Sequence, residues 1–76
     1  MKRYKIENNP NIHAYEYHVS GISGHFELIR EYPNKWSVIF LDYGNQTRGF
    51  ISRSENYHDS IQIMKNFVQF MTHVSL

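Results

Sequence analysis

The spacing of apolar residues changes from two to 3.6 after Ser52, and this change constrains the fold more than any other feature of the chain. Beyond it, apolar and polar side chains fall in opposite halves of a helical wheel. The apolar half holds Ile61, Ile63, Met64, Phe67, Val68, Phe70, Met71 and Val74, and the polar half holds Gln62, Lys65, Asn66, Gln69, Thr72 and His73. Asn56 is a candidate N-cap, and Asp59 lies in a first turn that favours negative charge. The pattern predicts one amphipathic helix, from Tyr57 to Val74, that packs on a sheet.

Runs with strand character precede the helix and are separated by turn residues. The expected strands are Ile12 to Val19, His25 to Tyr32, Trp36 to Tyr43 and Gln46 to Ser52, with a further short strand at Tyr4 to Glu7. A chain of 76 residues is long enough for one core and too short for two. We therefore expect a single α+β domain, residues 1–76, in which an antiparallel meander of about four strands carries one C-terminal helix on one face.

The turns also predict a register, with Tyr15 opposite Ile29, Leu28 opposite Phe40, Tyr32 opposite Trp36 and Ile39 opposite Phe50. One face of the sheet then carries Ile12, Ala14, Phe26, Leu28, Tyr32, Trp36, Val38, Phe40 and Ile51, and we expect the helix to cover it. A slip of one residue in any strand would exchange that strand's two faces.

The other face predicts a binding surface, because it combines large apolar side chains with Tyr, Glu and Arg. Its candidate protein-binding residues are Tyr15, Tyr17, Glu27, Ile29, Ile39, Leu41, Arg48 and Phe50. Two alternatives remain open at this point. The N-terminal segment, including Tyr4 and Ile6, could fold across this face, or a second copy of the chain could pair with it as a homodimer.

Charge argues against an electrostatic role. Eight Lys and Arg residues balance seven Asp and Glu residues, and the two signs are interleaved from Lys2 to Lys65. We therefore expect neither direct nucleic-acid binding through a basic patch nor mimicry of DNA. The chain has no cysteine, and no apolar run follows the basic residues at its start, so we expect a cytoplasmic protein without a membrane partner.

Catalytic and metal-binding motifs are not apparent in the sequence. The five histidines form no HxxxH pair on the helix and have no cysteine partner, so we expect them at the surface or rim. His58 and Asp59 are adjacent, which on a helix points their side chains about 100° apart. We expect no enzyme activity, no metal and no cofactor.

Two short stretches resemble nucleic-acid-associated families. Arg48-Gly49-Phe50 is similar to the third strand of the RNA-recognition motif, but Ile51-Ser52-Arg53 departs from that family's pattern. The meander and helix from Trp36 to Met71 resemble HicB-type antitoxins, although the acidic and glycine positions of that family do not align here. This resemblance implies an alternative role as a nucleic-acid-associated regulator, such as a HicB-like antitoxin or a small repressor.

In size, in having Ala14 as its only alanine, and in its meander over 12–52 followed by a helix over 57–74, the chain resembles small phage-encoded inhibitors of bacterial defence, anti-CRISPR proteins among them. The resemblance covers no motif and transfers no functional residue. It implies a non-catalytic protein that blocks a host protein or ribonucleoprotein complex by occupying a surface.

Overall fold

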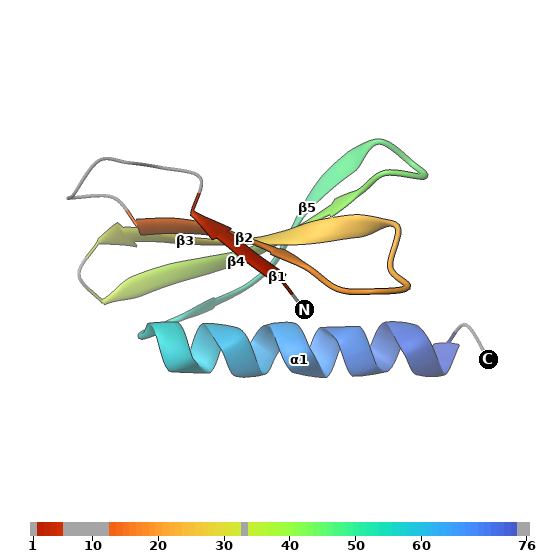
Figure 1. Cartoon of the computed structure of the whole chain (residues 1–76). Helices are drawn as coiled ribbons and strands as arrows, with labels where there is room; N and C mark the ends of the chain where they lie inside the picture. Colours follow the sequence, from red (N-terminus) through yellow and green to blue (C-terminus); the bar gives the residue numbers. More distant parts are fainter. Residues whose placement is uncertain (1, 6–12, 33, 75–76) are drawn as a thin grey trace.

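The structure is a computed structural model, and it describes residues 2–5, 13–32 and 34–74. The elements are β1 (Lys2–Lys5), β2 (His13–His18), β3 (Gly24–Tyr32), β4 (Lys35–Asp42), β5 (Thr47–Ser54) and α1 (Tyr57–Val74). All the strands pair antiparallel in the order β1-β2-β3-β4-β5. The α+β meander with one C-terminal helix is thus confirmed, with five strands where the sequence predicted about four. Figure 1 shows α1 lying along one side of the sheet, while the other side carries no second layer.

The helix has the bounds predicted from its periodicity. Its N-cap is Asn56, whose side-chain oxygen accepts a hydrogen bond from the amide of Asp59 at 2.8 Å. Asp59 in turn accepts a bond from the Asn56 side-chain amide at 3.1 Å, so the two side chains close the first turn reciprocally. Among the described residues, no helix combines the length and apolar character needed to cross a membrane.

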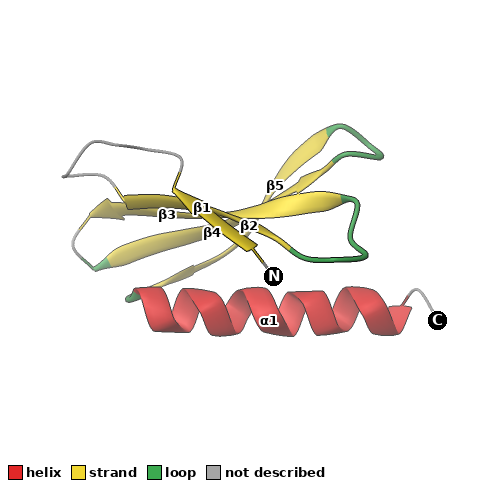
Figure 2. Cartoon of the chain, viewed as in Figure 1, coloured by secondary structure: helices red, strands yellow, loops and turns green. Residues whose placement is uncertain are grey.

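The core lies between α1 and the sheet (Figure 2). Its buried members are Tyr17, Phe26, Leu28, Trp36, Val38 and Met64. Phe67 reaches from the helix to the rings of Phe26 and Phe40, with centroid distances of 5.9 Å to each. The helix therefore covers the face that was predicted from Phe26, Leu28, Trp36, Val38 and Phe40.

The predicted interface between the helix and the sheet also included Phe70 of the helix and Ile12 of the sheet. Phe70 belongs to the apolar half of the wheel but is 63% exposed. It lies about 90° from the centre of that half, at its boundary with the polar half. Ile12 lies outside the described residues, as does the Ile6 of the alternative in which the N-terminal segment crosses the sheet; β1 itself pairs with the edge of β2.

The turn between β2 and β3 shifts the register of β2 by one residue from the prediction. The amide of Ile22 donates to the carbonyl of Val19 at 3.2 Å, and Gly21 has a φ of 86°, which marks a tight turn with glycine at its third position. Tyr15 consequently pairs with Leu28 rather than with Ile29. Because side chains alternate along a strand, this shift reverses both faces of β2.

Of the other three predicted pairings, one is confirmed and two are wrong. Ile39 pairs with Phe50, as predicted. Tyr32 pairs with Lys35 rather than with Trp36, which is a displacement of one residue at the turn. A bulge between Arg30 and Tyr32 adds a second residue, so Leu28 pairs with Val38 rather than with Phe40. The displacement of Leu28 is two residues, so it leaves the faces of β3 and β4 as predicted.

Candidate functional site

We use the term open face for the side of the sheet that α1 does not cover. Cross-strand partners point to the same side of a sheet, so the register fixes its membership. The residues of the open face are Lys2 and Tyr4 on β1; Ala14, Glu16 and His18 on β2; His25, Glu27, Ile29 and Glu31 on β3; Ser37, Ile39 and Leu41 on β4; and Arg48, Phe50 and Arg53 on β5.

The half of the open face formed by β4 and β5 is apolar and basic. Phe50 is 60% exposed, although its pairing partner Ile39 is buried at 8%. The guanidinium of Arg53 lies 5.6 Å from the centre of the Phe50 ring, which is within the range of a cation–π contact. Phe50 thus stands out from a packed aliphatic base with a cationic group at its side.

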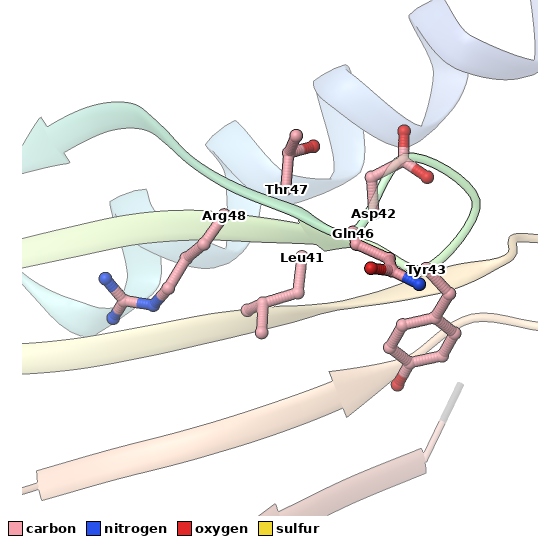
Figure 3. A pocket seen from close by; sticks show the side chains of 6 residues that line it. All are labelled: Leu41, Asp42, Tyr43, Gln46, Thr47 and Arg48. Atoms are coloured by element: carbon pink, nitrogen blue, oxygen red, sulfur yellow. The ribbon is translucent and has the colours of Figure 1, made fainter.

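A hollow of about 330 Å³ adjoins this half at the β4–β5 hairpin. Its lining comprises Leu41, Asp42, Tyr43, Gln46, Thr47 and Arg48 (Figure 3). The carboxylate of Asp42 accepts bonds from the amides of Gly44 at 2.9 Å and Asn45 at 3.3 Å, and these bonds hold the turn in place. Figure 3 shows Leu41 and Tyr43 pointing to the opposite side from Asp42 and Thr47, so the first pair belongs with the open face.

The half of the open face formed by β2 and β3 is polar. Glu16 lies directly opposite Glu27, and like charges in this arrangement repel one another. Nε2 of His18 and Nε2 of His25 each lie 3.1 Å from the same oxygen of Glu16. Arg48 donates to the other carboxylate, Glu27, at 3.2 Å. Basic and imidazole groups therefore surround both carboxylates.

The two imidazoles are themselves held by aromatic neighbours. The rings of His18 and His25 stack with centroids 5.1 Å apart. The Tyr43 hydroxyl is hydrogen-bonded to Nδ1 of His25, and the ring of Tyr4 meets His18 edge-on at 5.4 Å. His25 is buried at 8% exposure, whereas the side chain of His18 is 38% exposed. Glu16, His18 and His25 are the described residues that could hold a metal ion, since one ligand atom from each lies within 4.8 Å of the others.

The structure divides the predicted binding residues between the two faces. Glu27, Ile29, Ile39, Leu41, Arg48 and Phe50 lie together on the open face. Tyr15 and Tyr17 do not, because the one-residue shift turns them toward the helix. Tyr17 is buried in the core at 6% exposure, and Tyr15 packs on Tyr57 with ring centroids 5.7 Å apart. Ala14 moves the opposite way, from the predicted helix face to the open face.

Arg3 accompanies these tyrosines on the helix side. Its guanidinium lies 5.1 Å from the centre of the Tyr15 ring and donates to the Tyr57 hydroxyl at 3.3 Å. The hydrogen bond to Tyr57 raises the pKa of Arg3 above its ordinary value. Arg3 therefore stays protonated and links β1 to the start of α1.

Glu16, His18 and His25 were not among the predicted site residues, although the sequence contains a signal for them. Glu16-Tyr17-His18 and His25-Phe26-Glu27 are mirror images around the β2–β3 turn. An antiparallel hairpin folds such a palindrome so that equivalent residues meet on one face. A helical histidine spacing does not reveal this cluster, because the mirrored residues indicate a shared face only when the position of the β2–β3 turn is known.

Comparisons with known proteins found no match among family models, curated proteins or solved structures. The candidate site therefore rests on the geometry of this chain alone.

Proposed function

We propose that this protein is a non-catalytic binding protein that uses the open face of its sheet to occupy a surface of a host protein or ribonucleoprotein complex. The role is that of the small phage-encoded inhibitors of bacterial defence, and its setting is the host cytoplasm. The observation that carries the proposal is the exposure of Phe50, at 60%, on a face that no other element of the described chain covers. Aromatic side chains, phenylalanine included, and arginine are enriched at protein interfaces relative to the rest of the surface.

A protein surface suits the open face better than a nucleic acid does. Glu16, Glu27 and Glu31 lie on this face with Lys2, Arg48 and Arg53, so the carboxylates equal the cationic groups in number and the face is not a basic patch. Glu27 also neutralises Arg48 directly, at 3.2 Å. Phosphate groups laid across such a face would meet negative charge, whereas a protein can place cationic and apolar groups to match it.

The two halves of the face define the chemistry of the partner. Around Phe50 and Leu41 the partner must offer an apolar pocket, with acidic groups at its rim to meet Arg53. A surface with this combination would cover Phe50 and leave the helix side exposed.

Two exposed phenylalanines make a matched experiment possible, because Phe50 on the sheet is 60% exposed and Phe70 on the helix is 63% exposed. The tagged full chain is captured from nuclease-treated host lysate as wild type, Phe50→Asp and Phe70→Asp, after each variant is shown to melt as the wild type does. We expect a co-captured host protein that Phe70→Asp retains and Phe50→Asp loses by about 10-fold or more, the scale of an interface hot spot.

Other outcomes separate the alternatives. A partner held equally by Phe50→Asp and Phe70→Asp would exclude the open face as the binding surface. A captured complex that disappears on nuclease treatment, together with a salt-sensitive gel shift of DNA or RNA, would favour the nucleic-acid-associated regulator instead.

A further inference from the structure

We propose that Glu16, His18 and His25 form a binding site for a divalent transition-metal ion of the zinc type. This site is independent of the proposed protein partner and uses the polar half of the open face. Two imidazole nitrogens with one carboxylate oxygen form a ligand set that zinc and its neighbours favour, and that Mg²⁺ and Ca²⁺ do not.

The separations between the ligand atoms fit a shared ion. Ligands bound at 2.0–2.1 Å with tetrahedral angles lie about 3.3 Å from one another. Nε2 of His18 and Nε2 of His25 are each 3.1 Å from Oε1 of Glu16, and all three atoms lie within 4.8 Å. A small movement of the exposed His18 ring would bring the three atoms around one ion.

The tautomer of His25 can be set by its other ring nitrogen. A metal-binding histidine commonly donates its second N–H to a nearby oxygen, and this bond orients the ring. The Tyr43 hydroxyl is hydrogen-bonded to Nδ1 of His25 and can accept that proton, which leaves a lone pair on Nε2. In this tautomer Nε2 points its lone pair at Glu16, at 3.1 Å, and lies 3.8 Å from Glu27. In the other tautomer Nε2 would donate to Glu16 instead, so a bound cation would select the tautomer in which Nε2 is unprotonated.

Charge balance supports the same conclusion. The facing carboxylates of Glu16 and Glu27 carry two negative charges, of which Arg48 neutralises one through Glu27. A divalent ion at Glu16 would offset the repulsion across β2 and β3.

The site would also fasten the β2–β3 hairpin, because its ligands come from both strands on either side of the turn. His25 is buried and fixed, whereas His18 is partly exposed, so solvent reaches the site from the His18 side. A zinc-type ion with three protein ligands keeps a position for water or for a group from another molecule.

The test is a titration of the untagged full chain with Zn²⁺ against a chromophoric chelator, with Co²⁺ as a spectroscopic probe. The variants are Glu16→Gln and His18→Ala, which change partly exposed side chains. His58→Ala is the control, because His58 is an exposed histidine on α1. Circular dichroism melting first establishes that each variant is folded.

We expect the wild type to bind one Zn²⁺ and to give the visible absorption of four-coordinate Co²⁺. Glu16→Gln and His18→Ala should each weaken Zn²⁺ binding by at least about 10-fold, and Tyr43→Phe should weaken it by about 10-fold through the orientation of His25. The control His58→Ala should bind as the wild type does. No stoichiometric binding by the wild type, an affinity unchanged in either ligand variant, or an equal loss in His58→Ala would each overturn the proposal and leave a hydrogen-bonded cluster without a metal.

Discussion

Tyr17 on β2 lies directly opposite Phe26 on β3, and both side chains are buried in the core beside Met64. This pairing fixes the register of the hairpin and decides which face β2 contributes to the core. It also removes Tyr17 from the binding surface that the sequence predicted.

Tyr17→Ala should therefore destabilise the protein. Truncating a large buried aromatic side chain costs about 3 to 5 kcal/mol of unfolding free energy, a large part of the stability of a domain this small. Tyr4→Ala is the control, because Tyr4 is 49% exposed on the outer strand, and the loss of its edge-on contact with His18 should cost only about 1 kcal/mol. Chemical denaturation measures both. Equal, small effects would mean that Tyr17 faces solvent and that the register is displaced.

The helix and the β2–β3 hairpin differ in how much of their structure could be predicted from the sequence. The helix could be predicted to its ends, because eighteen residues of regular periodicity and a capping pair, Asn56 and Asp59, act together. The turn at Val19 to Ile22 could not be predicted as closely, because several types of glycine-containing turn are compatible with its sequence. A single residue of difference there reverses β2 and moves Tyr15 and Tyr17 to the core.

The candidate site shows the same difference between the residues of β3 to β5 and the residues whose face depends on the β2 register. The face on which its β3, β4 and β5 residues lie was predicted correctly, because the Ile39–Phe50 pair was right and the error between β3 and β4 was an even number of residues. The cluster of Glu16, His18 and His25 was not predicted, because the mirrored residues around the turn indicate a shared face only with the β2 register that the structure shows.

Phe67 and Phe70 test how α1 packs on the sheet. Phe67→Ala should cost about 3 to 5 kcal/mol, because its ring fills the space against Phe26 and Phe40. Phe70→Ala, at an exposed position, should stay within about 0.5 kcal/mol of the wild type. The two unfolding free energies are measured by urea denaturation. A larger loss for Phe70→Ala would show that α1 is rotated about its axis relative to the sheet.

Gly24 tests the close approach of β3 to β4, and Gly49 on β5 is its control. A methyl group at Gly24 would overlap the backbone carbonyl of Leu41 and the ring of Phe40, so Gly24→Ala should cost about 1 to 3 kcal/mol. The same substitution at Gly49 meets no atom within 4 Å and should be close to neutral. Thermal melting compares the two variants. A Gly24→Ala protein as stable as Gly49→Ala would mean that the start of β3 does not lie against Leu41.

The oligomeric state bears on what covers the open face. In a symmetric pairing centred on Phe50, the Arg53 guanidinium groups that lie beside the two Phe50 rings would come close to one another and repel. We therefore expect light scattering at micromolar concentration to give the 9.1 kDa mass of a monomer. A doubled mass that returns to the monomer value in Phe50→Asp would instead identify a second copy as the occupant of the face.

Site-specific photo-crosslinking in the living host tests the use of the open face most directly. A benzophenone amino acid is introduced at Phe50 in one experiment and at Phe70 in another, so that two similarly exposed positions on opposite sides of the molecule are compared. We predict a nuclease-resistant adduct with a host protein from Phe50 and none from Phe70. An adduct from Phe70 alone, or one from Phe50 that nuclease digests, would contradict the account.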